Sequence, residues 1–201
     1  MHNSLSTRSS LYSTWKYKYG IQHTSAHPIG SLPESCTLFA MTEYLKNVAL
    51  VGASGNLGSK VLPALIQQGQ HNITVISRVE SNATFPEGVL VKKGTYDDNG
   101  FLESSFAGQD IVIFMLGFAA MKDEDNMIHA AAKAGVKYVI PSEFGSPSED
   151  PAFVEAVPML AGNLARHDLI RSLGLKYIVV STNAWLDYVS TPRSGVGDGR
   201  Y

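Results

Sequence analysis

One stretch, Lys46 to Leu65, constrains the fold of this chain most; it reads KNVALVGASGNLGSKVLPAL. The apolar run Val48 to Val51 predicts a strand, and Gly52, Gly55 and Gly58 predict a tight turn into a helix. This arrangement suits a dinucleotide, because the N–H groups and the positive dipole end of the helix then face the pyrophosphate. The spacing G-x-x-G-x-x-G is less common than G-x-G-x-x-G and also occurs in ordinary turns, so a purely structural turn stays open as the alternative.

Each glycine of the turn has a separate expected role. Gly52 lets the chain turn sharply off the strand, Gly55 lets the backbone approach a pyrophosphate, and Gly58 lets the helix pack closely on the strand. The cofactor-binding residues predicted in this turn are Gly52, Ser54, Gly55, Asn56, Leu57 and Gly58.

The second strand, around Ile73 to Ile76, ends at Ser77-Arg78. An acidic residue about 20 positions beyond the glycines binds the ribose 2′-hydroxyl of NAD in the classical fingerprint. Arg78 occupies that place here, and its guanidinium suits a 2′-phosphate through bidentate, charge-assisted bonds. The sequence therefore predicts NADP(H) rather than NAD, with a solvated surface arginine as the alternative interpretation.

Further strands are predicted at Val89–Lys92, Ile111–Leu116, Val136–Ile140 and Tyr177–Ser181, with helical segments between most of them. The fold class is therefore α/β, a Rossmann-like doubly wound parallel sheet with the expected strand order 3-2-1-4-5-6. The segment from Val79 to Gly88 is too short for a crossover helix. Leu116, Gly117 and Pro141 end two of these strands and are further predicted cofactor contacts.

Polar residues follow the fifth predicted strand, at Ser142 and Glu143, where ligands bind in parallel sheets. They are candidate catalytic residues, and a helix N-cap with a nearby acid is the alternative. Asp123 to Asp125 is interpreted as a solvated helix N-terminus that favours the dipole, not as a metal patch. His129 is interpreted as a surface or packing residue, so no metal site is predicted.

Composition excludes some classes of protein. The net charge is −2 with no basic cluster, which argues against nucleic acid as a partner. The longest apolar run, Ile111 to Ala120, is about half of what spans a bilayer, so no membrane segment is expected. The single cysteine, Cys36, forms no internal disulfide and fits a cytoplasmic location.

Both ends of the chain differ from the middle. Residues 1–40 carry one acidic residue, Glu34, and no lasting periodicity, so we expect a disordered or spurious extension; mitochondrial targeting is the less favoured alternative. Met41 lies close to the first strand. Residues 41–190 are predicted to form the NAD(P)-binding domain, and the glycine-rich residues 191–201 a flexible tail.

Four residue groups carry a family resemblance: VGASGNLG at 51–58, SR at 77–78, KYVIPSEFG at 137–145 and LIRSLGLKYIVVSTNAWLDY at 169–188. With them the chain resembles the isoflavone reductase-like and NmrA-like family of atypical short-chain dehydrogenase/reductases. The resemblance implies an NADP(H)-binding sheet and hydride transfer to a small molecule, such as an aromatic secondary metabolite. NmrA-like members are instead regulators that bind the dinucleotide without known chemistry and would need a protein partner.

Two departures from the family bear on catalysis. Active reductases place a lysine before the sixth strand, and the matching position here is Asn163, which cannot exchange a proton usefully at neutral pH. Arg166 and His167 lie one turn on, and a solvated helix face is predicted for both. Family members also continue for roughly a hundred residues beyond the position of Tyr201, so the resemblance implies that the C-terminal substrate region is truncated.

Overall fold

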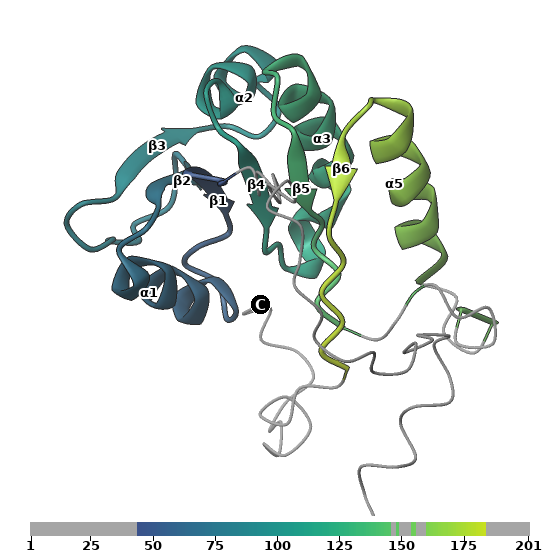
Figure 1. The fold of residues 1–201 in the computed structure, drawn as a ribbon, viewed down its shortest axis with the longest axis horizontal. Helices are drawn as coiled ribbons and strands as arrows, with labels where there is room; N and C mark the ends of the chain where they lie inside the picture. Colours follow the sequence, from purple (N-terminus) through teal and green to yellow (C-terminus); the bar gives the residue numbers. More distant parts are fainter. Residues whose placement is uncertain (1–43, 146–147, 149–153, 156–159, 184–201) are drawn as a thin grey trace, which may run out of the picture. The chain divides into compact units, whose positions relative to one another are not determined.

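The computed structural model describes residues 44–145, 148, 154–155 and 160–183 (Figure 1). The first predicted segment, residues 1–40, and the predicted tail, residues 191–201, lie outside these ranges. The described helices are α1 (Gly58–Gln68), α2 (Asn99–Phe106), the 3₁₀ helix η1 (Phe118–Asp123), α3 (Glu124–Lys133) and α5 (Ala161–Ser172). The strands are β1 (Asn47–Val51), β2 (Asn72–Arg78), β3 (Leu90–Gly94), β4 (Ile111–Phe114), β5 (Tyr138–Ile140) and β6 (Lys176–Tyr177).

The described strands form one parallel sheet in the order β3-β2-β1-β4-β5-β6. This order confirms the prediction made from the alternation of apolar runs and helical patterns. It also places the reversal of strand order between β1 and β4, directly beside the glycine turn. Ligands of open parallel sheets bind at such a reversal.

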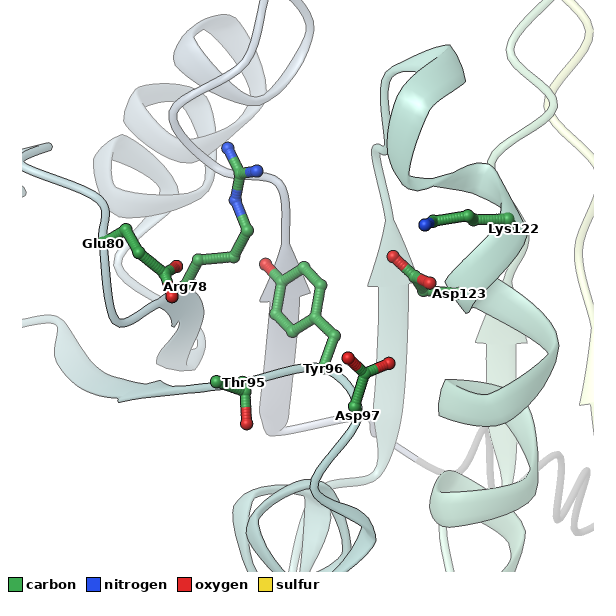
Figure 2. Close-up of a pocket in the computed structure, with 7 residues that line it drawn as sticks. All are labelled: Arg78, Glu80, Thr95, Tyr96, Asp97, Lys122 and Asp123. Atoms are coloured by element: carbon green, nitrogen blue, oxygen red, sulfur yellow. The ribbon is translucent and has the colours of Figure 1, made fainter.

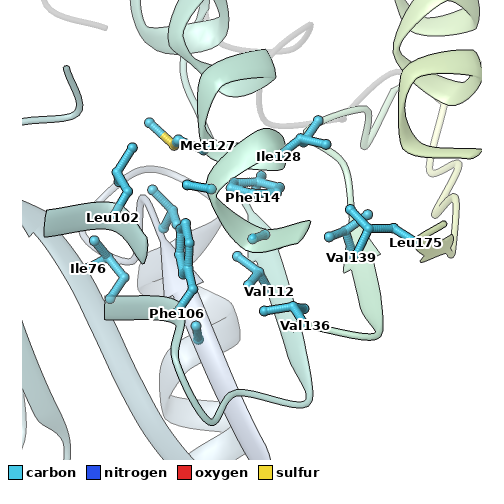
Figure 3. Close-up of a cluster of buried hydrophobic side chains, with 14 of the residues drawn as sticks. Ile76, Leu102, Phe106, Val112, Phe114, Met127, Ile128, Val136, Val139 and Leu175 are labelled. Atoms are coloured by element: carbon cyan, nitrogen blue, oxygen red, sulfur yellow. The ribbon is translucent and has the colours of Figure 1, made fainter. Parts of the chain in front are cut away.

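Helices cover both faces of the sheet. Successive side chains of a strand point to opposite faces, so an apolar strand needs packing partners on each face. Val48 and Leu50 of β1 pack with Leu62 of α1 on one face. Ala49 and Val51 belong to the larger cluster on the other face, which contains residues of α2, α3 and α5 (Figure 3). The strand is therefore buried on both sides, as a continuous apolar run predicts.

Several element boundaries differ from the predictions. The predicted strands at 111–116 and 177–181 end earlier in the structure, because the chain leaves the ladder where it enters the loops at the carboxyl edge. The strand predicted at 136–140 begins two residues later, at Tyr138, and ends at Ile140 as predicted. Residues 79–89 contain no helix, as predicted from their length. Helix α1 continues through Pro63 and ends at Gly69, whose φ of 64° is the left-handed conformation expected of a C-terminal stop.

Candidate functional site: the carboxyl edge of the sheet

The glycine turn is packed so tightly that two of its positions have no room for a side chain. Gly52 has φ of 86°, and a Cβ atom there would lie 2.2 Å from the carbonyl oxygen of Met115. A Cβ atom on Gly58 would lie 2.2 Å from the carbonyl oxygen of Gly52. The turn therefore lies directly against the end of β4, where the Met115 amide donates to the Val51 carbonyl at 2.9 Å.

The outer side of this turn is open to solvent. Ser54, Gly55 and Asn56 are exposed, and Leu57 is partly buried. Helix α1 begins at Gly58 with no side-chain cap and no acidic residue in its first turn. A helix N-terminus of this kind favours a bound anion, because its dipole end is positive and no carboxylate opposes the anion.

A pocket of about 180 Å³ lies beside the end of β2, and Figure 2 shows its lining. Two cationic side chains face it: Arg78 from the end of β2 and Lys122 from η1. Neither takes part in an ion pair with another residue of the described ranges. The remaining lining residues are Glu80, Thr95, Tyr96, Asp97 and Asp123.

Tyr96 lies between these two cations in the pocket (Figure 2). Its hydroxyl donates to the Ile76 carbonyl at 3.4 Å, and its carbonyl accepts from the Asn126 side chain at 3.1 Å. Burial raises the pKa of Tyr96 to about 12, with Arg78 lowering it and Asp123 raising it further. The phenol therefore stays neutral at physiological pH and can donate a hydrogen bond. Sequence reasoning missed Tyr96, although its place just after β3 at the carboxyl edge was a usable signal.

Ser142 joins the ends of β4 and β5. Its hydroxyl accepts from the Leu116 amide at 2.8 Å and donates to the Leu116 carbonyl at 3.1 Å. Its own amide donates to Oε1 of Glu124 at 2.7 Å. Gly117 is exposed beside this junction, and Pro141 is buried in it.

Glu143 points away from Ser142 toward α5. Its Oε1 lies 2.5 Å from Nε2 of His167, and its Oε2 accepts from the Ser148 hydroxyl at 2.8 Å. All three residues are buried, with 6%, 1% and 1% of their surface exposed for Glu143, Ser148 and His167. Because Ser148 donates to the carboxylate and not to the imidazole, this is not an activated serine nucleophile.

Two interpretations of charged residues were wrong. Glu124 is completely buried, not part of a solvated helix N-terminus, because its carboxylate accepts from the Ser142 amide of the neighbouring loop. Arg166 and His167 do not form a solvated face: the Arg166 side chain is 10% exposed and His167 is 1% exposed. Both turn inward because carboxylates of α3 and of the β5 loop pair with them. His129 is exposed on α3, which agrees with its interpretation as a surface residue.

Burial also changes the electrostatics of Glu124. Desolvation raises its pKa to about 7, while Arg166 and the Ser142 amide lower it, and Asp125 and Glu143 raise it. Nε of Arg166 lies 3.5 Å from Oε2 of Glu124 and 3.0 Å from Asp125. Glu124 thus changes its charge close to neutral pH.

Asn163 is 6% exposed on α5, one turn before His167. The described residues hold no group of three His, Cys, Asp or Glu side chains suited to a metal ion. Across the same ranges, the helices all lack the length or the apolar character needed to cross a bilayer.

Comparison with known proteins identifies the family. The model of the NmrA-like family matches residues 45–191, most of the chain. The chain belongs to the NmrA-like family. Among relatives of this family member, the oxidoreductase aprR of Aspergillus flavus is 33% identical over 114 residues, which cover 56% of this chain and 38% of aprR.

Two solved structures share the fold of this NmrA-like chain. The crystal structure of an isoflavone reductase has a TM-score of 0.63 at 22% identity and covers 77% of this chain and 54% of its own. The binary complex of leucoanthocyanidin reductase from Vitis vinifera with NADPH has a TM-score of 0.58 at 19% identity, covering 69% and 50%. The Rossmann-like fold is thereby confirmed. The NmrA-like chain spans about half the length of these structures and less of aprR.

Proposed function

We propose that this chain binds NADP(H) and serves a reductase that transfers hydride to a small molecule. The observation that carries the proposal is Arg78, a cation without an ion-pair partner in the described ranges, lining a pocket at the end of β2. In a doubly wound sheet this is the place of the 2′-substituent of the adenosine ribose. The relatives support the same function, since aprR is an oxidoreductase and leucoanthocyanidin reductase is solved with NADPH.

The residues present fit a dinucleotide. The glycine turn packs closely on the end of β4, because Cβ atoms at Gly52 and Gly58 would collide with the backbone, and its exposed position Gly55 carries no side chain toward a pyrophosphate. Gly52 to Gly58 would hold the pyrophosphate, Arg78 the 2′-phosphate, and Leu116, Gly117 and Pro141 the nicotinamide half. NADPH supplies the hydride when bound, and the protein contributes position and polarisation.

Affinity measurements test this proposal. We expect the wild-type protein to bind NADPH more tightly than NADH. Arg78→Ala should weaken the binding of NADPH by about 10- to 100-fold, which is the contribution expected of a charge-assisted hydrogen bond. NADH affinity should stay unchanged, because NADH has no 2′-phosphate. Wild-type protein that binds neither nucleotide, or a variant that keeps its preference for NADPH, would contradict the proposal.

A second candidate function is a dinucleotide-binding regulator that acts through a protein partner. One observation favours it: the titratable side chains around the β5 end, Glu124, Glu143 and His167, are all buried. The family resemblance adds to it, because it implies that Asn163 stands where active reductases have a lysine. Ser142 and Glu143 stay candidate catalytic residues, but their side chains are engaged with Leu116 and His167. Hydride transfer to a carbonyl leaves an oxygen that needs a proton, and the side chains of Glu124, Glu143 and His167, which could supply one, are buried within the fold.

The two functions separate by turnover. Oxidation of NADPH is followed by absorbance with a panel of aromatic enones and aldehydes, for wild type, Asn163→Ala and Asn163→Lys. A reductase that uses Asn163 to polarise the substrate should slow with alanine, and lysine should sustain or raise the rate. Tight NADPH binding with no turnover in any of the three proteins would favour the regulator.

The location of the protein is part of the proposal. We place it in the cytoplasm, because its single cysteine, Cys36, fits a reducing compartment. Imaging the full chain with a C-terminal fluorescent tag tests this, and accumulation in mitochondria would contradict it.

A further inference from the structure

The side chain of Ser142 and the buried carboxylate of Glu124 connect the ends of β4 and β5. Ser142 bonds both polar groups of the Leu116 backbone, at 2.8 and 3.1 Å. Glu124, the first residue of α3, accepts from the Ser142 amide at 2.7 Å. The end of β4, the loop after β5 and the start of α3 therefore meet at one point, where Glu124 supplies the charged group that accepts from Ser142.

This point lies across β1 from the end of β2, and the Arg78 pocket reaches toward it, because Lys122 and Asp123 of η1, which directly precede Glu124, also line that pocket. β2 and β4 flank β1 on opposite sides, and the order of strands reverses there. A dinucleotide whose 2′-phosphate is held at the end of β2 extends its other half over the ends of β4 and β5. Leu116 and Gly117 would then help to hold the nicotinamide half.

We propose that Glu124 is a positioning residue for the nicotinamide half of the dinucleotide, acting through Ser142 and the Leu116 backbone. The inference rests on the proposed function, because it requires that the chain binds NADP(H). Glu124 cannot touch the ligand itself, since its side chain is completely buried. Its carboxylate instead holds the loop after β5 in place through the hydrogen bond to the Ser142 amide.

The two oxygens of Glu124 are held differently. Oε1 accepts from Ser142, whereas Oε2 has no hydrogen-bond partner among the described residues. The group that faces Oε2 is Arg166 of α5, 3.5 Å away, and Arg166 also pairs with Asp125 of α3 at 3.0 Å. The ionised carboxylate therefore gains from Arg166 and makes a charge-assisted bond to Ser142, while the neutral acid keeps only a weaker bond.

The charged groups around Glu124 set the direction of its effect. Arg166 favours the ionised form, and Asp125 and Glu143 disfavour it, with Glu143 itself paired to His167. Burial outweighs Arg166, and the pKa of Glu124 lies at about 7. The junction should therefore tighten as pH rises through neutrality, so that affinity for the nicotinamide half rises as well.

A fragment of the cofactor distinguishes this role from a general loss of structure. 2′,5′-ADP carries the 2′-phosphate but lacks the nicotinamide half. Dissociation constants of NADPH and 2′,5′-ADP are measured for wild type, Glu124→Ala and Glu124→Gln from pH 5.5 to 8.5. Glu103→Gln, a solvent-accessible glutamate of α2, is the matched control. Phosphate monoesters titrate at about pH 6, one in NADPH and two in 2′,5′-ADP, so the pH profiles are compared between proteins for the same ligand, where this titration cancels.

We expect Glu124→Ala to weaken NADPH about tenfold at pH 8 and to change 2′,5′-ADP by less than about twofold. Glu124→Gln keeps an acceptor for the Ser142 amide, so its affinity for NADPH should stay within about threefold of wild type. It should lose the additional rise of NADPH affinity with pH that we expect of the wild-type protein. Equal weakening of both ligands, no effect of either substitution, or identical pH profiles for wild type and Glu124→Gln would overturn the inference. Wild-type protein that binds neither ligand would overturn the proposed function as well.

Discussion

Nε2 of His167 lies 2.5 Å from Oε1 of Glu143, although 24 positions separate the two residues in the sequence. His167 also stacks on Tyr177 with ring centroids 4.7 Å apart. The guanidinium of Arg171 lies over the Tyr177 ring, 5.3 Å from its centre. The contact thus connects the β5 loop, α5 and β6. Glu143 and His167 are both buried, so the stability of the fold depends on their pairing.

Replacement of His167 should destabilise the protein strongly. His167→Ala leaves the Glu143 carboxylate buried without its nitrogen partner, which costs about 3–5 kcal/mol of unfolding free energy. Urea denaturation followed by circular dichroism measures this loss. His129→Ala is the control, because His129 is exposed on α3 and should change stability by less than about 0.5 kcal/mol. Similar values for the two variants would show that the pair contributes little.

A methyl group at the glycine turn should be more damaging than one at the end of β4. Gly52→Ala forces a left-handed φ of 86° on alanine and a Cβ atom to 2.2 Å from the Met115 carbonyl, so we expect a loss of about 3 kcal/mol. A Cβ atom on Gly117 meets nothing within 4 Å, so Gly117→Ala should be tolerated. The melting temperatures of both variants, compared with wild type, measure these losses. A Gly52→Ala protein as stable as wild type would mean that the turn rearranges.

Stability should depend on pH through Glu124. The pKa of this carboxyl rises from 4.5 to about 7 on folding, so between these values the native state binds more protons than the unfolded state. Stability therefore falls as pH rises through this window, by roughly 3 kcal/mol in total, and changes little above it. Denaturation of wild type and Glu124→Gln at several pH values isolates this contribution, since glutamine does not titrate. A difference between the two proteins that does not vary with pH would contradict it.

Lys122 should contribute to the choice between NADPH and NADH. Its side chain faces the same pocket as Arg78 and has no ion-pair partner among the described residues (Figure 2). Lys122→Met should weaken NADPH about fivefold and leave NADH unchanged, the size expected of a solvent-accessible ionic contact. Lys133→Met, a lysine of α3 that pairs with Glu103, is the control. Equal affinity changes for both nucleotides would contradict a contact with the 2′-phosphate.

The strand order and the position of Arg78 could be predicted because both follow from local patterns. Val48 to Val51 and Ile111 to Phe114 are apolar at every position, and such runs occur in parallel sheets with helices on both faces. Arg78 was found by counting from the glycines, because the length of the intervening helix and strand is nearly constant in such folds.

The buried charges could not be predicted in the same way. A glutamate at a helix start and an Arg-His pair on a helix normally face solvent, so burial of Glu124 and His167 contradicts the local expectation. The partners that satisfy these buried groups are distant in sequence: the Ser142 amide, 18 positions away, donates to Glu124, and Glu143 pairs with His167. Only the folded arrangement of α3, β5 and α5 brings these groups together.

The order of strands has a consequence for synthesis of the protein. Among the strands that the structure describes, β1 leaves the ribosome first; it is central in the sheet and pairs with β2 on one side and with β4 on the other. Its second edge therefore stays unpaired until residues beyond 111 have been made, and before then α2 covers only part of the face that carries Ala49 and Val51. Translation at about 5–20 residues per second leaves this apolar surface exposed for several seconds, a time in which aggregation competes with folding. The nascent chain is thus a candidate client of chaperones that bind apolar strands near the exit tunnel.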